Sequence, residues 1–363
     1  MKVKKRMKAV LCVILMVCLM GGMLPVHAAS GRTQVYVDER VVTFDVSPIA
    51  RNGRTLVAIS LVCSRIGADL AWDGPTQTVT IKRAATTIEL TIGSTTAFVN
   101  GVPHTLDVAP VIIRDRTMMP LRFIMEQFNQ KVEWDEENNS IYITEDTSFL
   151  TEESDMTPWI LGCNAIIAYR NRQGPNAATW WNRGVNWRRT LENSWGCYNR
   201  EDLLATIAYM TDNGQSSMFD EDADFFRELA ANDEYDLFLS IFTSEKDAYM
   251  SKMVIDYDQK WGEKSIKAWD WFRMTHLIYW GYMSGYLEFR EVHELAKPIA
   301  DRLKATFSSW DEATENYMDG YLYWSQGDPA NPGGEYTLRV KSYETMKAEQ
   351  EQRGLLFDPK VWE

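Results

Sequence analysis

The chain has 363 residues, a formal net charge of −13 and five cysteines, and 12% of its residues are aromatic. A surface this acidic repels phosphate backbones, so nucleic acid is excluded as an expected partner. Only three of the five cysteines lie beyond residue 28, an odd number with no Cys-x-x-Cys pair, so a disulfide-built scaffold is excluded. The length suits two domains that each bury a core of their own.

Residues 1–28 read as a secretory signal peptide. Basic residues within 2–8 precede an apolar run over 9–24, and Val26-His27-Ala28 supplies small residues for cleavage. Cleavage removes five positive charges and no negative ones, so the formal charge falls from −13 to −18. We expect a secreted, extracellular or cell-wall-associated protein with no transmembrane helix after signal cleavage.

The next part of the chain is one unit written twice. Residues 37–81 align with residues 99–143 without a gap, at an offset of 62 residues. The identical pairs include Asp45 and Asp107, Arg54 and Arg116, Trp72 and Trp134, and Asp73 and Asp135. Such self-similarity indicates a repeated supersecondary unit.

Each copy is expected to contain one short helix and a small sheet. The first copy has an i, i+3, i+4, i+7 apolar pattern, and the second repeats it. Gly67 and Asn129 then favour the left-handed conformation that ends a helix. Alternating strands follow each Trp-Asp pair, and Asn100-Gly101 predicts a hairpin. The apolar residues are Ile59, Val62, Cys63 and Ile66 in the first copy and Leu121, Ile124, Met125 and Phe128 in the second.

The run Arg-Thr-x-x-Pro-Leu-Arg-Phe-Ile at 116–124, with Trp134-Asp135 and Val99-Asn100-Gly101, resembles the copper amine oxidase N-terminal-like domain over residues 34–145. The resemblance implies a stalk or appendage, common on exported proteins of Gram-positive bacteria, that carries neither the copper site nor the catalytic quinone. The first copy departs from this run, because it has Ser60 where the second has Arg122.

Six residues of the repeats are interpreted as structural. We expect the two tryptophans to cover the helix end of each sheet, with the following aspartate accepting N–H groups of the turn. Ligand stacking on the tryptophans is the alternative. The six residues are Arg54, Trp72, Asp73, Arg116, Trp134 and Asp135.

Residues 146–158 are an acidic linker, and residues 159–363 are predicted to form an all-helical, tryptophan-rich domain. Asn199 is expected to cap a helix that ends at Gly214, and Ser309-x-x-Glu312 reads as a capping box. Pro298 is expected to kink or split the helix that contains it. The inward-facing residues are Leu203, Ile207 and Met210 after the first cap and Trp310, Ala313, Tyr317, Tyr321 and Trp324 after the second.

The segment from Ser265 to Tyr286 is apolar around most of a helix and is predicted to be the central, buried helix. Several motifs of this domain, centred on tryptophan, resemble the bacterial domain of unknown function 1266, over about residues 155–355. The resemblance supports a helical fold and implies no chemistry. The motifs are Ser194-Trp195-Gly196, Asp202-Leu203, Ala268-Trp269-Asp270 with Arg273, Gly281-Tyr282 with Gly285-Tyr286, and Ser309-Trp310 with Tyr317 and Gly320.

Seven residues of the helical domain are candidates for contacts to a ligand or partner. Asp270 and Arg273 lie three apart and could bind a polar ligand, but an ion pair that fixes helix packing is the favoured interpretation. The tryptophans could stack on sugar rings, although core packing is favoured for most of them. The seven are Trp195, Asp202, Trp269, Asp270, Arg273, Tyr282 and Trp310.

No catalytic or metal-binding constellation is evident. After the signal segment the histidines are His104, His276 and His293, none at metal-ligand spacing, so no metal or cofactor is expected. Cys163 and Cys197 could pair, but unpaired thiols are favoured.

We therefore predict an α+β repeat domain followed by an all-α domain, in an exported cell-envelope protein. The repeats would act as a stalk or docking module. The helical domain would be a non-catalytic interaction module for cell-wall glycan or another envelope protein. The alternative is a cell-envelope hydrolase that uses dispersed carboxylates around Asp270, since two acids brought together by folding leave no local motif.

Overall fold

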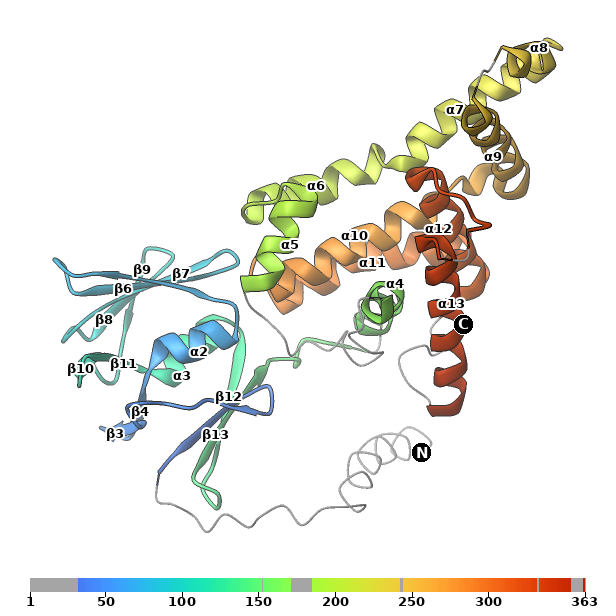
Figure 1. Ribbon diagram of the computed structural model, residues 1–363. Helices are drawn as coiled ribbons and strands as arrows, with labels where there is room; N and C mark the ends of the chain where they lie inside the picture. The colour runs from blue at the N-terminus through green and yellow to red at the C-terminus, as the bar shows by residue number, and fades with distance from the viewer. Residues whose placement is uncertain are drawn as a thin grey trace.

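The computed structural model describes residues 32–151, 153–170, 185–241, 244–331, 333–353 and 362. The predicted signal peptide lies outside these residues. A β-rich domain that ends at Glu145 is followed by helices from Thr157 onward, which confirms the predicted fold class (Figure 1).

The N-terminal domain is built from short strands and two short helices among the described residues. The helices are α2 (Ile59–Arg65) and α3 (Leu121–Gln127). The strands are β1 (Gln34–Val37), β2 (Arg40–Val41), β3 (Ile49–Arg51), β4 (Arg54–Ala58), β5 (Asp69–Asp73), β6 (Thr78–Arg83), β7 (Thr86–Thr91), β8 (Thr96–Val99), β9 (Val102–Thr105), β10 (Val111–Ile113), β11 (Arg116–Pro120), β12 (Gln130–Asp135) and β13 (Ser140–Glu145).

The two repeats interlock. The strand orders are β12-β13-β1-β2, β10-β11-β4-β3 and β5-β6-β7-β8-β9, so every sheet contains strands from both copies. Strand β1 of the first copy pairs in parallel with β13 of the second. The expectation of one sheet per repeat is thus wrong, because the outer strands of each copy find their hydrogen-bond partners on the other.

The helices and their ends follow the sequence pattern. All eight apolar positions on α2 and α3 are buried in one core. Gly67 and Asn129 both have positive φ, 74° and 56°, as expected for residues that end a helix. Cys63 is buried in this core, which raises the pKa of its thiol to about 12.

Trp72 and Trp134 are not buried, which corrects the expectation that they cover the sheets. Their exposed fractions are 45% and 47%. They lie on β5 and β12, which are edge strands of their sheets, and the residues of these strands that face away from the core have no further layer over them. Asp135 does accept the Asn138 backbone N–H at 3.1 Å, as predicted.

The helical domain surrounds one central helix, α10, which contacts α4, α5, α6, α7, α11 and α12 (Figure 1). It coincides with the predicted central helix and is buried along most of its length. The helices are α4 (Thr157–Arg170), α5 (Val185–Trp195), α6 (Arg200–Asp212), α7 (Gln215–Ala231), α8 (Tyr235–Ser240), α9 (Glu245–Trp261), the short 3-10 helix η1 (Gly262–Lys264), α10 (Lys267–Met283), α11 (Phe289–Thr306), α12 (Trp310–Ser325) and α13 (Glu335–Arg353).

The side chains of both predicted N-cap residues bind a backbone N–H of the helix that they precede, as predicted. The Asn199 side chain accepts the Asp202 N–H, and the Ser309 side chain accepts the Glu312 N–H. The capping box at Ser309 is incomplete, because the Glu312 carboxylate accepts the N–H of Ser308 and not that of Ser309. Gly214 does not end α6 but stands immediately before α7.

Two further predictions need correction. Helix α11 is not split at Pro298, because this residue lies on the exposed face of the helix. The carbonyl one turn earlier, which proline leaves without an N–H donor, can there bind water instead. Trp324 ends a stripe whose other members are buried, but its own ring is 50% exposed. Cys163 and Cys197 are free, as favoured.

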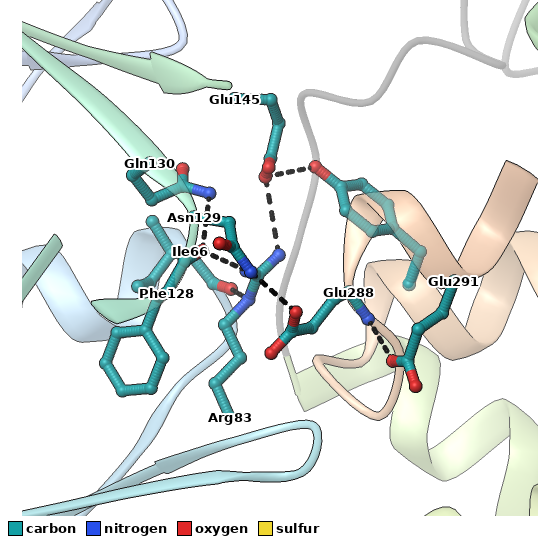
Figure 2. Close-up of polar contacts among 9 residues, drawn as sticks. Ile66, Arg83, Phe128, Asn129, Gln130, Glu145, Glu288 and Glu291 are labelled. Carbon is teal, nitrogen blue, oxygen red and sulfur yellow. Dashed lines mark hydrogen bonds and ion pairs between the residues drawn. The ribbon is translucent and has the colours of Figure 1, made fainter. Parts of the chain in front are cut away.

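The two domains meet at a buried arginine. Arg83 donates from Nε to the Ile66 carbonyl at 3.0 Å and from Nη1 to the Phe128 carbonyl at 3.1 Å, so it binds the carboxyl ends of α2 and α3 together (Figure 2). Its Nη2 lies 3.3 Å from Glu145. Tyr282 of α10 donates its hydroxyl to the same Glu145 oxygen at 2.6 Å.

Backbone contacts complete the junction. The Ala84 N–H donates to the Gly285 carbonyl at 2.8 Å. A Cβ atom at Gly285 would lie 2.0 Å from the Gly67 carbonyl oxygen, so only glycine fits there. Arg188 of α5 donates to the Gly67 and Ser284 carbonyls, which join one domain to the other.

Replacing the buried Arg83 with methionine should destabilise the protein by about 3 to 5 kcal/mol, since it leaves the half-buried Glu145 without its guanidinium and the Ile66 and Phe128 carbonyls without this donor. The exposed pair between Arg116 and Asp45 offers the matched control, and Arg116→Met should cost much less. Urea unfolding of both variants measures the difference. Equal losses would contradict a special role for Arg83.

Candidate functional site

A groove opens beside the second repeat. Its volume is about 720 Å³, within the range of ligand sites, and its walls come from strands of both copies and from the first turns of α3. The lining residues include Arg54, Leu121, Arg122, Phe123, Glu126, Val132, Glu133, Trp134 and Ile141.

The floor of the groove is apolar and its rim carries an aromatic ring. Leu121, Val132 and Ile141 are buried beneath it, and Phe123 is half-buried on one side. Trp134 stands at the edge with nearly half of its surface exposed. An exposed ring beside an apolar floor is a suitable platform for a flat or cyclic ligand.

The charges around the groove are paired. Arg54 lies 2.7 Å from Asp107, and Arg122 lies 3.7 Å from Glu126. Glu133 is 2.6 Å from Lys131 and raises the pKa of that lysine. The walls thus present many hydrogen-bond donors and acceptors with little net charge, which suits a neutral, polyhydroxylated ligand.

The equivalent surface of the first repeat has the tryptophan without this lining. Trp72 is exposed to the same degree as Trp134. The positions equivalent to Arg122, Phe123, Glu126 and Glu133 hold smaller or uncharged residues. They are Ser60, Leu61, Ser64 and Ala71.

In the helical domain, the structure brings four of the seven predicted residues together. The Arg273 guanidinium carbon lies 4.6 Å from the centre of the Trp195 ring and 4.9 Å from that of Trp269. Arg273 also lies 3.9 Å from Asp270. Burial lowers the pKa of Arg273, and Asp270 raises it in part.

Asp270 itself is occupied by backbone groups. It is 2% exposed, and its two oxygens accept the N–H groups of Gln215 at 2.9 Å and Ser216 at 2.8 Å, in the first turn of α7. A Cβ at Gly214 would lie 2.2 Å from this carboxylate, so the chain passes directly over it. Asp270 therefore caps α7. Both of its oxygens are engaged in this cap, which makes it a poor candidate for the central acid of a hydrolase.

The other three predicted residues lie elsewhere. Asp202 accepts the Tyr198 N–H at the start of α6. Trp310 packs against Trp159 and Trp362, which also contact each other, and Tyr282 belongs to the domain junction. The seven residues are therefore not one site, and their role in ligand binding stays a prediction.

The sequence analysis did not single out the groove residues Phe123, Glu126 and Glu133. A signal was available, since Arg122, Phe123, Glu126 and Glu133 are all positions at which the second copy differs from the first. Within the described parts of the chain, no group of three His, Cys, Asp or Glu residues is placed to hold a metal ion. The helices of those parts include none long and apolar enough to span a membrane.

Asp270→Asn should destabilise the protein by about 1 to 2 kcal/mol, because an amide oxygen replaces only one of two acceptors and the new NH2 group faces a backbone N–H. Asp224→Asn, an exposed change on α7, the helix that Asp270 caps, should have little effect on unfolding by urea. If the two variants unfold alike, the capping role is wrong.

His276 should make the protein less stable in acid. It is buried and bonded to the Cys163 carbonyl, and burial lowers its pKa from 6.5 to about 3. The unfolded chain therefore takes up the proton first, and stability falls as the pH drops from 6.5 towards 3, by roughly 1.4 kcal/mol per pH unit. His276→Gln should show a shallower slope in the same urea titrations.

The comparisons with known proteins cover both domains. Residues 36–143 match the family described as copper amine oxidase N-terminal domain. Residues 190–353 match the family described as protein of unknown function (DUF1266).

Two curated proteins from Escherichia coli (strain K12) are similar to part of the chain. The uncharacterized protein YbeR is 31% identical over 136 residues, and the uncharacterized protein YbeU is 31% identical over 134 residues. Each match covers 37% of this chain and 56% of the relative, so the chain spans about half the length of these relatives. In the order that the sequence motifs predict, the chain carries a copper amine oxidase N-terminal-like domain followed by a DUF1266 domain.

Proposed function

We propose that this is a non-catalytic binding protein of the cell envelope, in which the groove of the second repeat docks onto cell-wall glycan. The observation that carries the proposal is the exposed Trp134 ring beside an apolar floor and a set of paired charges. Sugar rings offer apolar faces for stacking and hydroxyls for hydrogen bonds, and the groove supplies a partner for each.

The predicted signal peptide supports the same proposal. The basic and apolar segment at 1–28 is typical of a signal peptide, and an exported protein of this kind meets wall polymers. The proposal places the protein outside the cytoplasm, secreted or held at the wall of a Gram-positive bacterium. The helical domain is then carried by a docking domain to which it is tightly joined.

A hydrolase is the less favoured alternative. Asp270 is buried beneath the start of α7 and accepts two backbone N–H groups, so it is poorly placed to meet a substrate. The centre of the helical domain is filled by aromatic side chains such as Phe272 and Tyr317, whose rings stack at 4.9 Å. A packed centre of this kind favours an interaction module.

Trp134→Ala should weaken binding of residues 29–363 to purified peptidoglycan at least tenfold, about 1.4 kcal/mol, in a sedimentation titration. Trp72→Ala removes an equally exposed ring without the lined groove and should leave binding unchanged. Binding that responds equally to both changes, or to neither, would refute the groove as the docking site. Release of soluble reducing sugars by the native protein would favour the hydrolase.

A further inference from the structure

Helices α7, α8 and α9 form an arm that extends away from the rest of the helical domain, with α8 at its tip (Figure 1). The arm has a small core of its own, which includes Phe219, Phe226 and Val254. This core also takes in Leu322 and Tyr323, near the end of α12. The base of the arm is therefore anchored, and its outer surfaces are free to meet a partner.

A second groove runs between α7, α9 and the end of α12. Its volume is about 360 Å³. Three large apolar side chains line it and remain strongly exposed, Met218 at 55%, Phe225 at 47% and Trp324 at 50%. Methionine and aromatic side chains together form an adaptable apolar surface of the kind that receives amphipathic helices.

The surroundings of this groove are strongly acidic. Residues 215–258 contain twelve acidic residues against three basic ones. Two of these bases are already paired, Arg227 with Asp224 and Lys252 with Asp256. Asp222 and Asp247 line the groove itself. Arg227 also lies 3.3 Å from Asp258, and among the described residues of the arm most of the other carboxylates form no ion pair with these bases.

We propose that this groove binds a cationic amphipathic helix of a partner protein. The apolar face of that helix would lie on Met218, Phe225 and Trp324, and its lysines or arginines would face Asp222 and Asp247. An acidic rim repels the headgroups of anionic lipids, so a membrane surface fits less well. This surface is separate from the Trp134 groove and takes a ligand of different chemistry.

The test titrates the full mature chain with a synthetic helix of lysine and leucine, followed by calorimetry. We expect saturable one-to-one binding that weakens as salt is added. Trp324→Ala should weaken binding at least tenfold, and Asp247→Lys should weaken it and reduce its dependence on salt. Tyr209→Ala, an exposed aromatic change on α6 outside the groove, should have no effect.

Several outcomes would overturn the proposal. They are absence of binding, equal binding of a helix with glutamate in place of lysine, and equal sensitivity to Trp324→Ala and Tyr209→Ala. Trp324-dependent binding to phosphatidylglycerol vesicles, without binding of the helix, would replace it with a membrane surface. Circular dichroism confirms that each variant is folded. Trp134→Ala should bind the helix normally, so failure of the glycan proposal can be told apart from failure of this one.

Discussion

One buried guanidinium connects the parts of this fold. The carboxyl ends of helices leave carbonyls without partners, and Arg83 binds one such carbonyl on α2 and one on α3. These carbonyls, of Ile66 and Phe128, are separated by the repeat offset of 62 residues, as are Arg83 and Glu145. Arg83 and Glu145 would thus be equivalent positions of the two copies, and they carry opposite charges. Tyr282 then joins the helical domain to it.

The contacts at the domain junction connect the domain that carries the first groove to the helices that carry the second. Helix α3 lines the first groove with its early turns, and Asn129, just after its end, donates to Glu288 at 2.6 Å across the junction (Figure 2). Helix α10 carries Tyr282 near one end and Asp270 near the other, where Asp270 holds the start of the arm. The two surfaces proposed for binding therefore belong to parts of the chain that attach to opposite ends of a single buried helix.

The repeat domain shows how far pattern reasoning extends. The apolar stripe containing Ile59 and Val62, the left-handed residues Gly67 and Asn129, and the Asn100-Gly101 turn are local features, and the structure has them as predicted. Strand partners are not local. The sequence does not say whether β1 pairs within its own copy or with β13, because both pairings would satisfy the same alternating pattern.

The sequence by itself determined the repeat, the fold class, the central helix and the side-chain caps at Asn199 and Ser309, because each shows in a pattern that can be read along the chain. Only the tertiary structure decided that Trp134 stands exposed beside a groove, that Asp270 caps α7 and that Arg83 links both domains. These roles depend on partners 50 or more residues away or on which strand forms an edge. Burial and pairing are properties of the packed chain, and a side chain's type alone does not fix them.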